Sequence, residues 1–235
     1  MNVHMLWVAG SLSRLEYQAI ASFVRQGFDV QLWHYGELAN VPEGVCQRDA
    51  REVLPESSLF LNRQGSYAGF SDLFRYAVLG KFGGLYSDVD VVALRPASEM
   101  PQTPFLVTER MRDGRAKING NVIHLPDPKP GDLIDLAAGY ATAFPKDKVF
   151  WSEIGPALLT AIAGIYPQHG FDIKPVTFAN PVNWWDCPQQ LLAPAPAPEQ
   201  AHFLHLYNEM WRRSGADKNQ PIPPDSMLAR ALGGA

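Results

Sequence analysis

The sequence contains little cysteine and no long hydrophobic run. Its two cysteines, Cys46 and Cys187, are far apart and neither belongs to a CxxC pair, so a disulfide framework or a structural zinc site has little support. No run of about 18 apolar residues occurs, and the start, Met1 to Trp7, lacks the basic stretch and long apolar core of a signal peptide. We therefore expect reduced thiols, no integral membrane segment and a cytoplasmic location.

The chain also lacks an excess of positive charge. Lys and Arg together number 20 against 24 Asp and Glu, which gives a formal net charge of -4. Nucleic acid and anionic membranes both call for clustered positive charge, so neither is an expected partner. A hydrophobic fraction of 46% in 235 residues is ordinary for one globular domain, and no internal repeat divides the chain.

The chain opens with a β-α-β pattern. Val3 to Val8 is a short apolar run that is typical of a strand. Ser13 with Glu16 three residues later forms a capping box, which predicts a helix that begins there, and Gly27 is placed to end it. From Phe28 to Leu32 apolar residues alternate with polar ones, as in a second strand.

A second helix is predicted from Ser71, a good N-cap residue, to the Gly83-Gly84 pair, which can supply the left-handed conformation that stops a helix. At about 100° per residue, Leu73 and its apolar neighbours form one stripe, while Asp72 and Arg75 fall on the other arc. These two charged side chains therefore point together, away from the main apolar stripe.

The rest of the chain alternates strands and helices. A β-branched run over residues 91–94, closed by Pro96, predicts a buried strand with an acidic pair at its start. Further strands are predicted at residues 105–108, 118–125, 173–178 and 203–207, and further helices at residues 132–144 and 156–165. This alternation predicts an α/β sandwich, a single domain over residues 1–235.

The acidic pair is Asp88-Val89-Asp90. In an extended segment alternate side chains share a face, so the two carboxylates project the same way from Cα atoms roughly 6.5 to 7 Å apart. A hard divalent ion that bridges these carboxylates and the oxygens of a diphosphate would neutralise the diphosphate and stabilise it as a leaving group. By itself an Asp-x-Asp pair is weak evidence, since such pairs usually lie solvated in loops.

The context of the pair carries more information. The whole stretch from Ser71 to Asp90 resembles the sugar-binding region of the DXD-containing glycosyltransferases, a group that includes bacterial and fungal enzymes and the glucosyltransferase domains of large clostridial toxins. The segments His4 to Gly10 and His205 to Trp211 resemble two further parts of the same family. The resemblance implies a GT-A type fold, a nucleotide-binding α/β domain with a mixed central sheet flanked by helices, and a UDP-sugar donor.

The resemblance also divides the domain. Residues 1–95 are expected to form the nucleotide-sugar-binding half, and residues 96–198, which match only loosely, the acceptor side. Residues 199–235 would be the C-terminal metal and diphosphate segment.

The family motif implies roles for single residues. Trp7 would stack on the nucleotide base, and Asp72 and Arg75 would hold the sugar hydroxyls and the diphosphate as part of the catalytic set, because a carboxylate accepts and a guanidinium donates in a planar fork. Asp88 would contact ribose or sugar, and the metal through water, while Asp90 would bind the metal directly. Without the family context, Asp72 and Arg75 would be a surface ion pair, and Trp7 a core residue.

The C-terminal segment offers the remaining ligands. His205 is the expected third metal ligand, and neutral imidazole suits Mn²⁺ better than Mg²⁺, so manganese is favoured. Asn208 competes for that role, because some relatives carry a carboxylate or an asparagine in this segment. Trp211 could close over the diphosphate, or could pack in the core as most tryptophans do.

The acceptor is not identified by the sequence. Polysaccharide, lipid-linked oligosaccharide and protein all fit, with surface-polysaccharide synthesis as the working expectation. The relatives are retaining, so retention is expected, whereas inversion would need a general base beside the acceptor hydroxyl. Glu153, Asn119 and Asn121 could line the acceptor side, and each could equally be a cap or turn residue.

Two other functions stay open. An aspartyl phosphotransferase or phosphatase would use Asp88 as nucleophile with Mg²⁺ on both aspartates, although such motifs usually end the first strand of their fold. A non-catalytic nucleotide-sugar-binding module would keep the fold without turnover, and the intact Asp72, Arg75, Asp88 and Asp90 argue against it.

Overall fold

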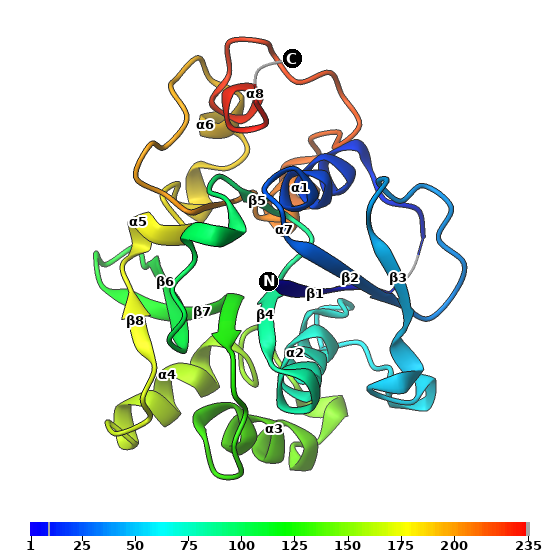
Figure 1. The fold of residues 1–235 in the computed structure, drawn as a ribbon, viewed down its shortest axis with the longest axis vertical. Helices are drawn as coiled ribbons and strands as arrows, with labels where there is room; N and C mark the ends of the chain where they lie inside the picture. Colours follow the sequence, from blue (N-terminus) through cyan, green and yellow to red (C-terminus); the bar gives the residue numbers. More distant parts are fainter. Residues whose placement is uncertain (9, 234–235) are drawn as a thin grey trace.

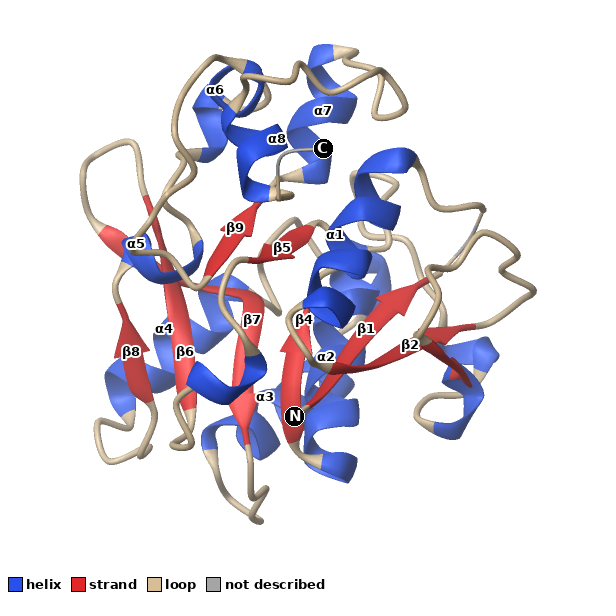
Figure 2. Cartoon of the chain, turned by 45° about the horizontal axis from the view of Figure 1, so that its top comes forward, coloured by secondary structure: helices blue, strands red, loops and turns tan. Residues whose placement is uncertain are grey.

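The centre of the protein is a seven-stranded mixed sheet. A computed structural model describes residues 1–8 and 10–233. Ala9, which belongs to the segment His4 to Gly10, and residues 234–235, which end the predicted C-terminal metal and diphosphate segment, lie outside the described residues. The strand order is β3-β2-β1-β4-β7-β6-β8, and Figure 2 labels the strands from β2 to β8 in this order. The strands are β1 Asn2–Trp7, β2 Asp29–His34, β3 Cys46–Asp49, β4 Gly84–Ser87, β6 Phe105–Arg110, β7 Ala116–Leu125 and β8 Asp172–Lys174.

The sheet changes direction at its middle. β1 pairs in parallel with β2 and β4, and β2 with β3, whereas β7 runs antiparallel to both β4 and β6. The helices are α1 Arg14–Arg25, α2 Ala68–Phe82, α3 Leu133–Ala143, α4 Pro156–Ile165, α5 Val176–Ala179, α6 Gln189–Leu192, α7 Asn208–Ser214 and α8 Met227–Ala231 (Figure 1). The predicted α/β fold, a mixed central sheet flanked by helices, is therefore confirmed.

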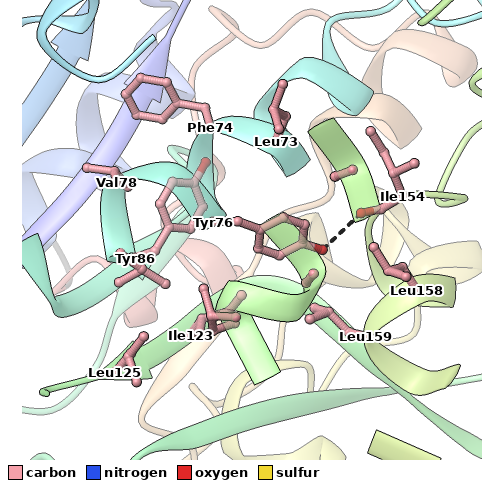
Figure 3. Close-up of a cluster of buried hydrophobic side chains, with 14 of the residues drawn as sticks. Leu73, Phe74, Tyr76, Val78, Tyr86, Ile123, Leu125, Ile154, Leu158 and Leu159 are labelled. Atoms are coloured by element: carbon pink, nitrogen blue, oxygen red, sulfur yellow. Dashed lines mark hydrogen bonds between the residues drawn. The ribbon is translucent and has the colours of Figure 1, made fainter. Parts of the chain in front are cut away.

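The helices pack on the sheet through separate hydrophobic clusters. The largest joins α2, α3 and α4 to the sheet, and a second buries Ile20 and Phe23 of α1 against β1, β2 and β4. In Figure 3, Tyr76 of α2 lies among side chains of β7 and α4, and its hydroxyl donates to the carbonyl of Ile154 at 3.0 Å. A third cluster packs α7 and α8 against α1 and a small two-stranded sheet, β5 Val91–Ala93 with β9 Phe203–His205.

The β-α-β opening is confirmed. The capping box of Ser13 and Glu16 is present at the start of α1, and Gly27 follows the helix with φ 76°. β1 and β2 then pair in parallel, with Val3 opposite Val30. The local sequence signals were sufficient here because each depends on neighbours a few residues away.

The second helix begins earlier than predicted. α2 starts at Ala68, three residues before Ser71, with Tyr67 at the N-cap position and no side-chain cap. The hydroxyl of Ser66, one residue before Tyr67, accepts the backbone N–H of Ala68 at 3.1 Å. The helix ends at Phe82 as expected, and Gly83 and Gly84 both have positive φ. The extra turn carries the helix along the same side of the molecule as the site described below.

Two strand predictions need correction. The strand predicted at residues 173–178 stops at Lys174, because Pro175 has no N–H to continue a ladder and instead precedes α5. The strand after the acidic pair is short and leaves the central sheet, so Asp88 and Asp90 lie in a turn between β4 and β5 instead of at the start of a buried strand of that sheet.

No helix within the described residues combines the length and apolarity needed to cross a bilayer.

Candidate active site

The acidic turn lies at the point where the chain leaves the central sheet. The N–H of Asp88 donates to the carbonyl of Asn121 at 2.8 Å, which extends the β4–β7 pairing by one residue. The carbonyl of Asp90 then accepts the N–H of Leu206 at 2.8 Å, and Val91 pairs with His205 in the small sheet. The β5–β9 pairing therefore places His205 next to two aspartates that are more than a hundred residues away in sequence.

Asp88, Asp90 and His205 converge on one point. Each offers a ligand atom, and these atoms all lie within 4.8 Å of one another. The nearest pair is Asp90 Oδ2 and His205 Nε2, at 3.5 Å. Among residues 1–8 and 10–233 this is the only cluster of three such side chains, and its spacing fits the ligands of a single ion.

A hydrogen-bond network fixes the orientation of His205. Its Nδ1 lies 3.1 Å from Oδ1 of Asn180, and the amide nitrogen of Asn180 donates to the carbonyl of Thr108 at 3.0 Å. Because that carbonyl can only accept, Oδ1 of Asn180 is the acceptor that faces the imidazole, and His205 carries its proton on Nδ1. Nε2 therefore faces Asp90, and in the neutral imidazole it carries the lone pair that a metal ligand requires.

Asn208 contributes an unpaired oxygen. Its backbone N–H donates to Asp90 Oδ2 at 2.7 Å, while its side-chain Oδ1 is buried without a hydrogen-bond partner. Leaving a buried acceptor unsatisfied costs about 1–3 kcal/mol. An ion bound beside Asp90 would satisfy this oxygen, so two carboxylates, an imidazole and an amide oxygen form a donor set that fits a divalent cation.

Burial and pairing set the charges of these groups. Burial raises the pKa of Asp88 above its usual range, although Arg75 opposes this. Burial also acts on Asp90, but the attraction and hydrogen bond of His205 outweigh it and hold the pKa of that carboxyl below its usual value. For His205, burial lowers the pKa and the Asp90 carboxylate raises it, with a net increase. Without a cation, the imidazole therefore tends to hold the proton that balances Asp90.

Arg75 links the acidic turn to α2. Its Nη1 lies 3.0 Å from Asp72 Oδ1 and its Nη2 lies 3.0 Å from Asp88 Oδ1, with the Arg75 and Asp72 side chains only 5% and 6% exposed. Tyr86 donates its hydroxyl to the same Asp88 oxygen at 3.3 Å. Burial raises the pKa of Asp72 to about 6, even though Arg75 opposes it. Asp72 and Arg75 are therefore a buried ion pair, and the alternative of a surface pair is wrong.

Two glycines make room for this ion pair. A Cβ atom at Gly120 in β7 would overlap Nη1 of Arg75, and one at Gly155 would overlap the carboxylate of Asp72. Neither glycine has a positive φ, so close approach of other side chains, and not turn geometry, is what requires glycine there. Arg75 Nε remains buried without a partner, which leaves one donor available in the middle of the cluster.

The charged groups of the site and Asn208 line one large cleft of about 750 Å³. Trp7, at the end of β1, lies half-buried on its wall and donates its indole N–H to the carbonyl of Gly10 at 2.7 Å. The side chains and backbone that line the cleft around the acidic turn include Asp72, Arg75, Asp88, Asp90, Asn119, His205, Tyr207 and Asn208. A ligand that fills the cleft could therefore touch Trp7 and the acidic turn together.

Residues 30–106 match the model of a protein family described as "Glycosyltransferase sugar-binding region containing DXD motif". The matched residues, about a third of the chain, contain Asp72, Arg75 and the Asp88-Val89-Asp90 turn around which the cleft is built. This part of the chain is therefore similar to the sugar-binding region of the DXD-motif glycosyltransferases.

Individual relatives are more distant. The human alpha-1,4-N-acetylglucosaminyltransferase is 25% identical to this chain over 154 residues, which is 60% of the present chain and 42% of the human protein. The chain thus spans less than half the length of that curated relative. The solved structure of the PaToxG glycosyltransferase has 17% identity and a TM-score of 0.49, over 71% of this chain and 69% of that one. The catalytic domain of alpha-toxin from Clostridium novyi has 10% identity and a TM-score of 0.36, over 59% and 56%.

The two tryptophans predicted for the donor site have different surroundings. Trp7 is on the cleft, where a base could reach it. Trp211 is only 1% exposed, packs in the third hydrophobic cluster and donates its indole N–H to the carbonyl of Leu206 at 2.9 Å. Trp211 thus takes the core role that the sequence left open, because α7 turns this side chain inward, and a diphosphate contact would require it to leave the core.

The structure also gives different surroundings to the three residues that were predicted for the acceptor side. Asn119 lines the cleft, whereas Asn121 is fully buried and donates its amide to Asn180. The Glu153 carboxylate accepts the N–H of Phe150 at 2.9 Å, so this residue has the turn role that the sequence left open beside an acceptor role. Of the three, Asn119 alone lines the cleft.

Several residues of the site were missed by sequence reasoning. Tyr86 stands within the resembling stretch, two residues before Asp88, and that proximity was a usable signal. Asn180 and the glycines at 120 and 155 carried no signal, because their roles depend on contacts across long sequence separations. Glu109 lines the cleft, 3.4 Å from the ammonium of Lys117, and nothing in its local sequence indicated this.

Proposed function

We propose that the protein is a metal-dependent glycosyltransferase that moves a sugar from a nucleotide sugar, a UDP-hexose or UDP-N-acetylhexosamine, to an acceptor. The observation that carries this proposal is the convergence of Asp88, Asp90 and His205 within 4.8 Å, on the wall of a cleft that also contains Trp7. A nucleotide sugar needs these two features together, because its base is apolar and flat while its diphosphate is strongly charged.

Asp90 and His205 would hold the cation, with Asn208 Oδ1 as a further ligand and Asp88 in contact through water or directly. When bound, the divalent ion would neutralise the diphosphate and stabilise it as the leaving group. The imidazole in the donor set favours Mn²⁺ over Mg²⁺. The unpaired oxygen of Asn208 supports its place beside His205, so the two are complementary ligands in this proposal instead of competitors.

Asp72 and Arg75 would orient the donor sugar. In the folded protein the guanidinium is already fixed between Asp72 and Asp88, so little side-chain freedom is lost when a ligand binds. The free Nε–H of Arg75 is a donor for a sugar or phosphate oxygen. Asp72, at the same wall, can accept from sugar hydroxyls.

Retention at the anomeric carbon is part of the proposal. The departing diphosphate could itself take the proton from the attacking hydroxyl of the acceptor, on the face of the sugar from which the diphosphate leaves. This route needs no separate base. Retention is tested by the anomeric coupling constant in a proton NMR spectrum of the product. An inverted product would instead direct attention to Glu109, the cleft carboxylate on β6, as general base.

The phosphotransferase alternative gains no support from the contacts of Asp88. One of its carboxylate oxygens accepts from both Arg75 and Tyr86, and a carboxylate held in this way is a weak nucleophile. Asp88 also follows β4, the middle strand of the sheet, instead of the first strand. A non-catalytic nucleotide-sugar-binding module would differ from an enzyme only in lacking turnover, and the assay below distinguishes the two.

The test measures binding and hydrolysis of UDP-sugars with and without Mn²⁺. We expect Mn²⁺-dependent binding by calorimetry and slow release of UDP from at least one of UDP-glucose, UDP-galactose and UDP-N-acetylglucosamine. Asp90→Ala should abolish both, whereas Asp113→Ala, which removes an exposed acid far along the β6–β7 hairpin, should change neither. Equal, metal-independent binding by wild type and Asp90→Ala would refute the metal bridge, and tight binding without any hydrolysis or transfer would favour the module.

A cytoplasmic location and a role in surface-polysaccharide synthesis complete the proposal. The exposed free thiol of Cys46 is compatible with a reducing compartment. Cell fractionation and the surface glycans of a deletion strain would test these two points independently of the assay above.

A further inference from the structure

The rim of the cleft carries an exposed tryptophan that the donor site does not use. Trp151 is 42% exposed and lines the same cleft as Asp72 and Arg75. Tyr67, 36% exposed, also lines it, and Phe150 beside Trp151 is 47% exposed. Large aromatic side chains leave apolar area in water here, in contrast to Trp33 and Trp211, which are fully buried. Clustered exposed aromatics at the mouth of a cleft indicate a binding surface.

The backbone of this rim is held in place by the neighbouring loop. The N–H of Trp151 donates to Oε1 of Gln64 at 3.1 Å, and the N–H of Arg63 donates to the carbonyl of Val149 at 2.9 Å. The Arg63 guanidinium also lies over the ring of Phe150, 4.5 Å from its centroid. Two loops are therefore joined to each other, and the tryptophan is presented from a fixed backbone.

The residue after the tryptophan is strained. Ser152 has φ 70°, a left-handed conformation that is uncommon for a residue other than glycine. Its carbonyl accepts the N–H of Ala157 at 3.0 Å, and this contact joins it to the start of α4. A strained backbone conformation persists only where contacts with the surrounding structure hold it in place, and such conformations are concentrated at functional sites. The turn it creates leads directly to Gly155, which lies against the carboxylate of Asp72.

These contacts place Trp151 next to the donor-sugar end of the cleft. Asp72 is touched by Gly155, four residues after Trp151, and Ser152 and Pro156 line the same wall. From the other side, the guanidinium of Arg213 on α7 lies over the Trp151 ring, 5.5 Å from its centroid. Arg213 thus lies over one face of the indole, and Ser152 and Arg213 both line the cleft, so polar groups that could bind hydroxyls lie close to the tryptophan.

We propose that Trp151 is the stacking platform of an acceptor subsite, and that the acceptor is a saccharide whose pyranose ring lies on the indole. A pyranose has one face of C–H groups and an equatorial rim of hydroxyls, which matches a flat apolar ring with polar donors at its edge. A peptide acceptor would need unpaired backbone donors and acceptors along the cleft, and a lipid chain would need a continuous apolar groove. This inference rests on the proposed glycosyltransferase function and adds the chemical class of its acceptor.

The first experiment is saturation-transfer NMR with methyl glycosides of glucose, galactose and N-acetylglucosamine and of their disaccharides, in the presence of UDP and Mn²⁺. Wild type should transfer saturation to the ring protons of at least one glycoside. Trp151→Ala should lose that signal, Trp151→Phe should keep part of it, and Tyr140→Ala, which removes an exposed aromatic on α3 away from the cleft, should keep all of it. No signal from wild type with any glycoside, or an equal signal from Trp151→Ala, overturns the inference.

The second experiment separates the acceptor from the donor. For the glycoside that binds, Trp151→Ala should raise the acceptor KM roughly tenfold, the loss expected for one aromatic contact, with unchanged hydrolysis of the UDP-sugar in the absence of acceptor. If hydrolysis falls in parallel with transfer, Trp151 belongs to the donor site and the inference is wrong. If wild type hydrolyses no UDP-sugar, the proposed function fails instead, so the two failures are distinguishable.

Discussion

At the scale of single residues, the site depends on groups whose charge is set by burial and by one partner. Asp90 and His205 lie 3.5 Å apart, and each stabilises the charged form of the other. Asp72 and Arg75 do the same beneath the cleft. Buried ion pairs of this kind contribute little net stability, because desolvation offsets their attraction, so their value lies in positioning.

The pKa of His205 predicts opposite pH dependences with and without metal. It is raised above 6.5, so the stability that protonation of this residue contributes is fully present below pH 6.5 and is lost as the pH rises through the raised value. A divalent ion needs the neutral imidazole, so affinity for Mn²⁺ should increase over the same interval. We expect melting temperatures measured against pH in EDTA and in Mn²⁺ to diverge with increasing pH.

Substitution of His205 provides the control for this prediction. His205→Ala should flatten the difference between the two pH profiles, since the titrating group is gone. If the variant keeps the divergence seen in wild type, another group controls metal binding.

Gly120 gives a prediction about the buried arginine. Gly120→Ala should push Nη1 of Arg75 away, weaken its contact with Asp88, destabilise the protein by about 1–3 kcal/mol and reduce UDP-sugar hydrolysis. Chemical denaturation and the hydrolysis assay measure the two effects. Gly139→Ala is a matched control, because a Cβ atom added to this glycine in α3 would have no neighbour within 4 Å, and the variant should gain about 0.5–1 kcal/mol of helix stability. Equal behaviour of the two variants would contradict the steric argument.

At the scale of elements, the small sheet of β5 and β9 brings the two parts of the metal site together. Its position depends on α1, because the buried hydroxyl of Ser22 accepts the N–H of Ala93 at 2.8 Å and donates to the carbonyl of Ala19 at 2.6 Å. The end of β5 is therefore anchored to the first helix. The helix predicted from a local capping box thus supports residues that lie far along the chain.

Removal of this anchor should reduce stability. Ser22→Ala leaves the buried N–H of Ala93 without a partner, so we expect a loss of about 1–3 kcal/mol in the free energy of unfolding by urea, with weaker Mn²⁺ binding as β5 loosens. Ser57→Ala, at an exposed position in the short 3-10 helix Glu56–Ser58, should stay within about 0.5 kcal/mol of wild type. A loss no larger than that of the control would show that β5 is held by its strand pairing alone.

At the scale of the whole molecule, the cleft forms where the central sheet changes from parallel to antiparallel pairing. β4 is the strand at that change, with β1 on one side and β7 on the other, and the acidic turn follows it directly. β1 contributes Trp7, β7 contributes Asn119, and the C-terminal segment contributes His205 and Asn208. Parts of all three predicted divisions of the chain therefore meet at this one cleft.

The sequence alone determined the features that depend on near neighbours. The capping box of Ser13, the helices at residues 132–144 and 156–165, and the resembling stretch around Asp88 and Asp90 were all readable in short windows, since hydrogen bonds and periodicity act within a few residues. The spacing of the two aspartates, taken together with the resembling stretch around them, led to the prediction of a metal site. It was not enough to predict the turn in which they lie.

Tertiary structure alone decided what meets the aspartates. The pairing of β5 with β9 positions His205, Asn180 fixes its tautomer, and Gly120 leaves space for Arg75. It also assigned Trp211 to the core and Trp151 to the rim of the cleft, although nothing in the local sequence of either tryptophan separates the two. The physical reason is that burial and long-range contacts depend on which surfaces pack together, and a local pattern carries no information about its distant partner.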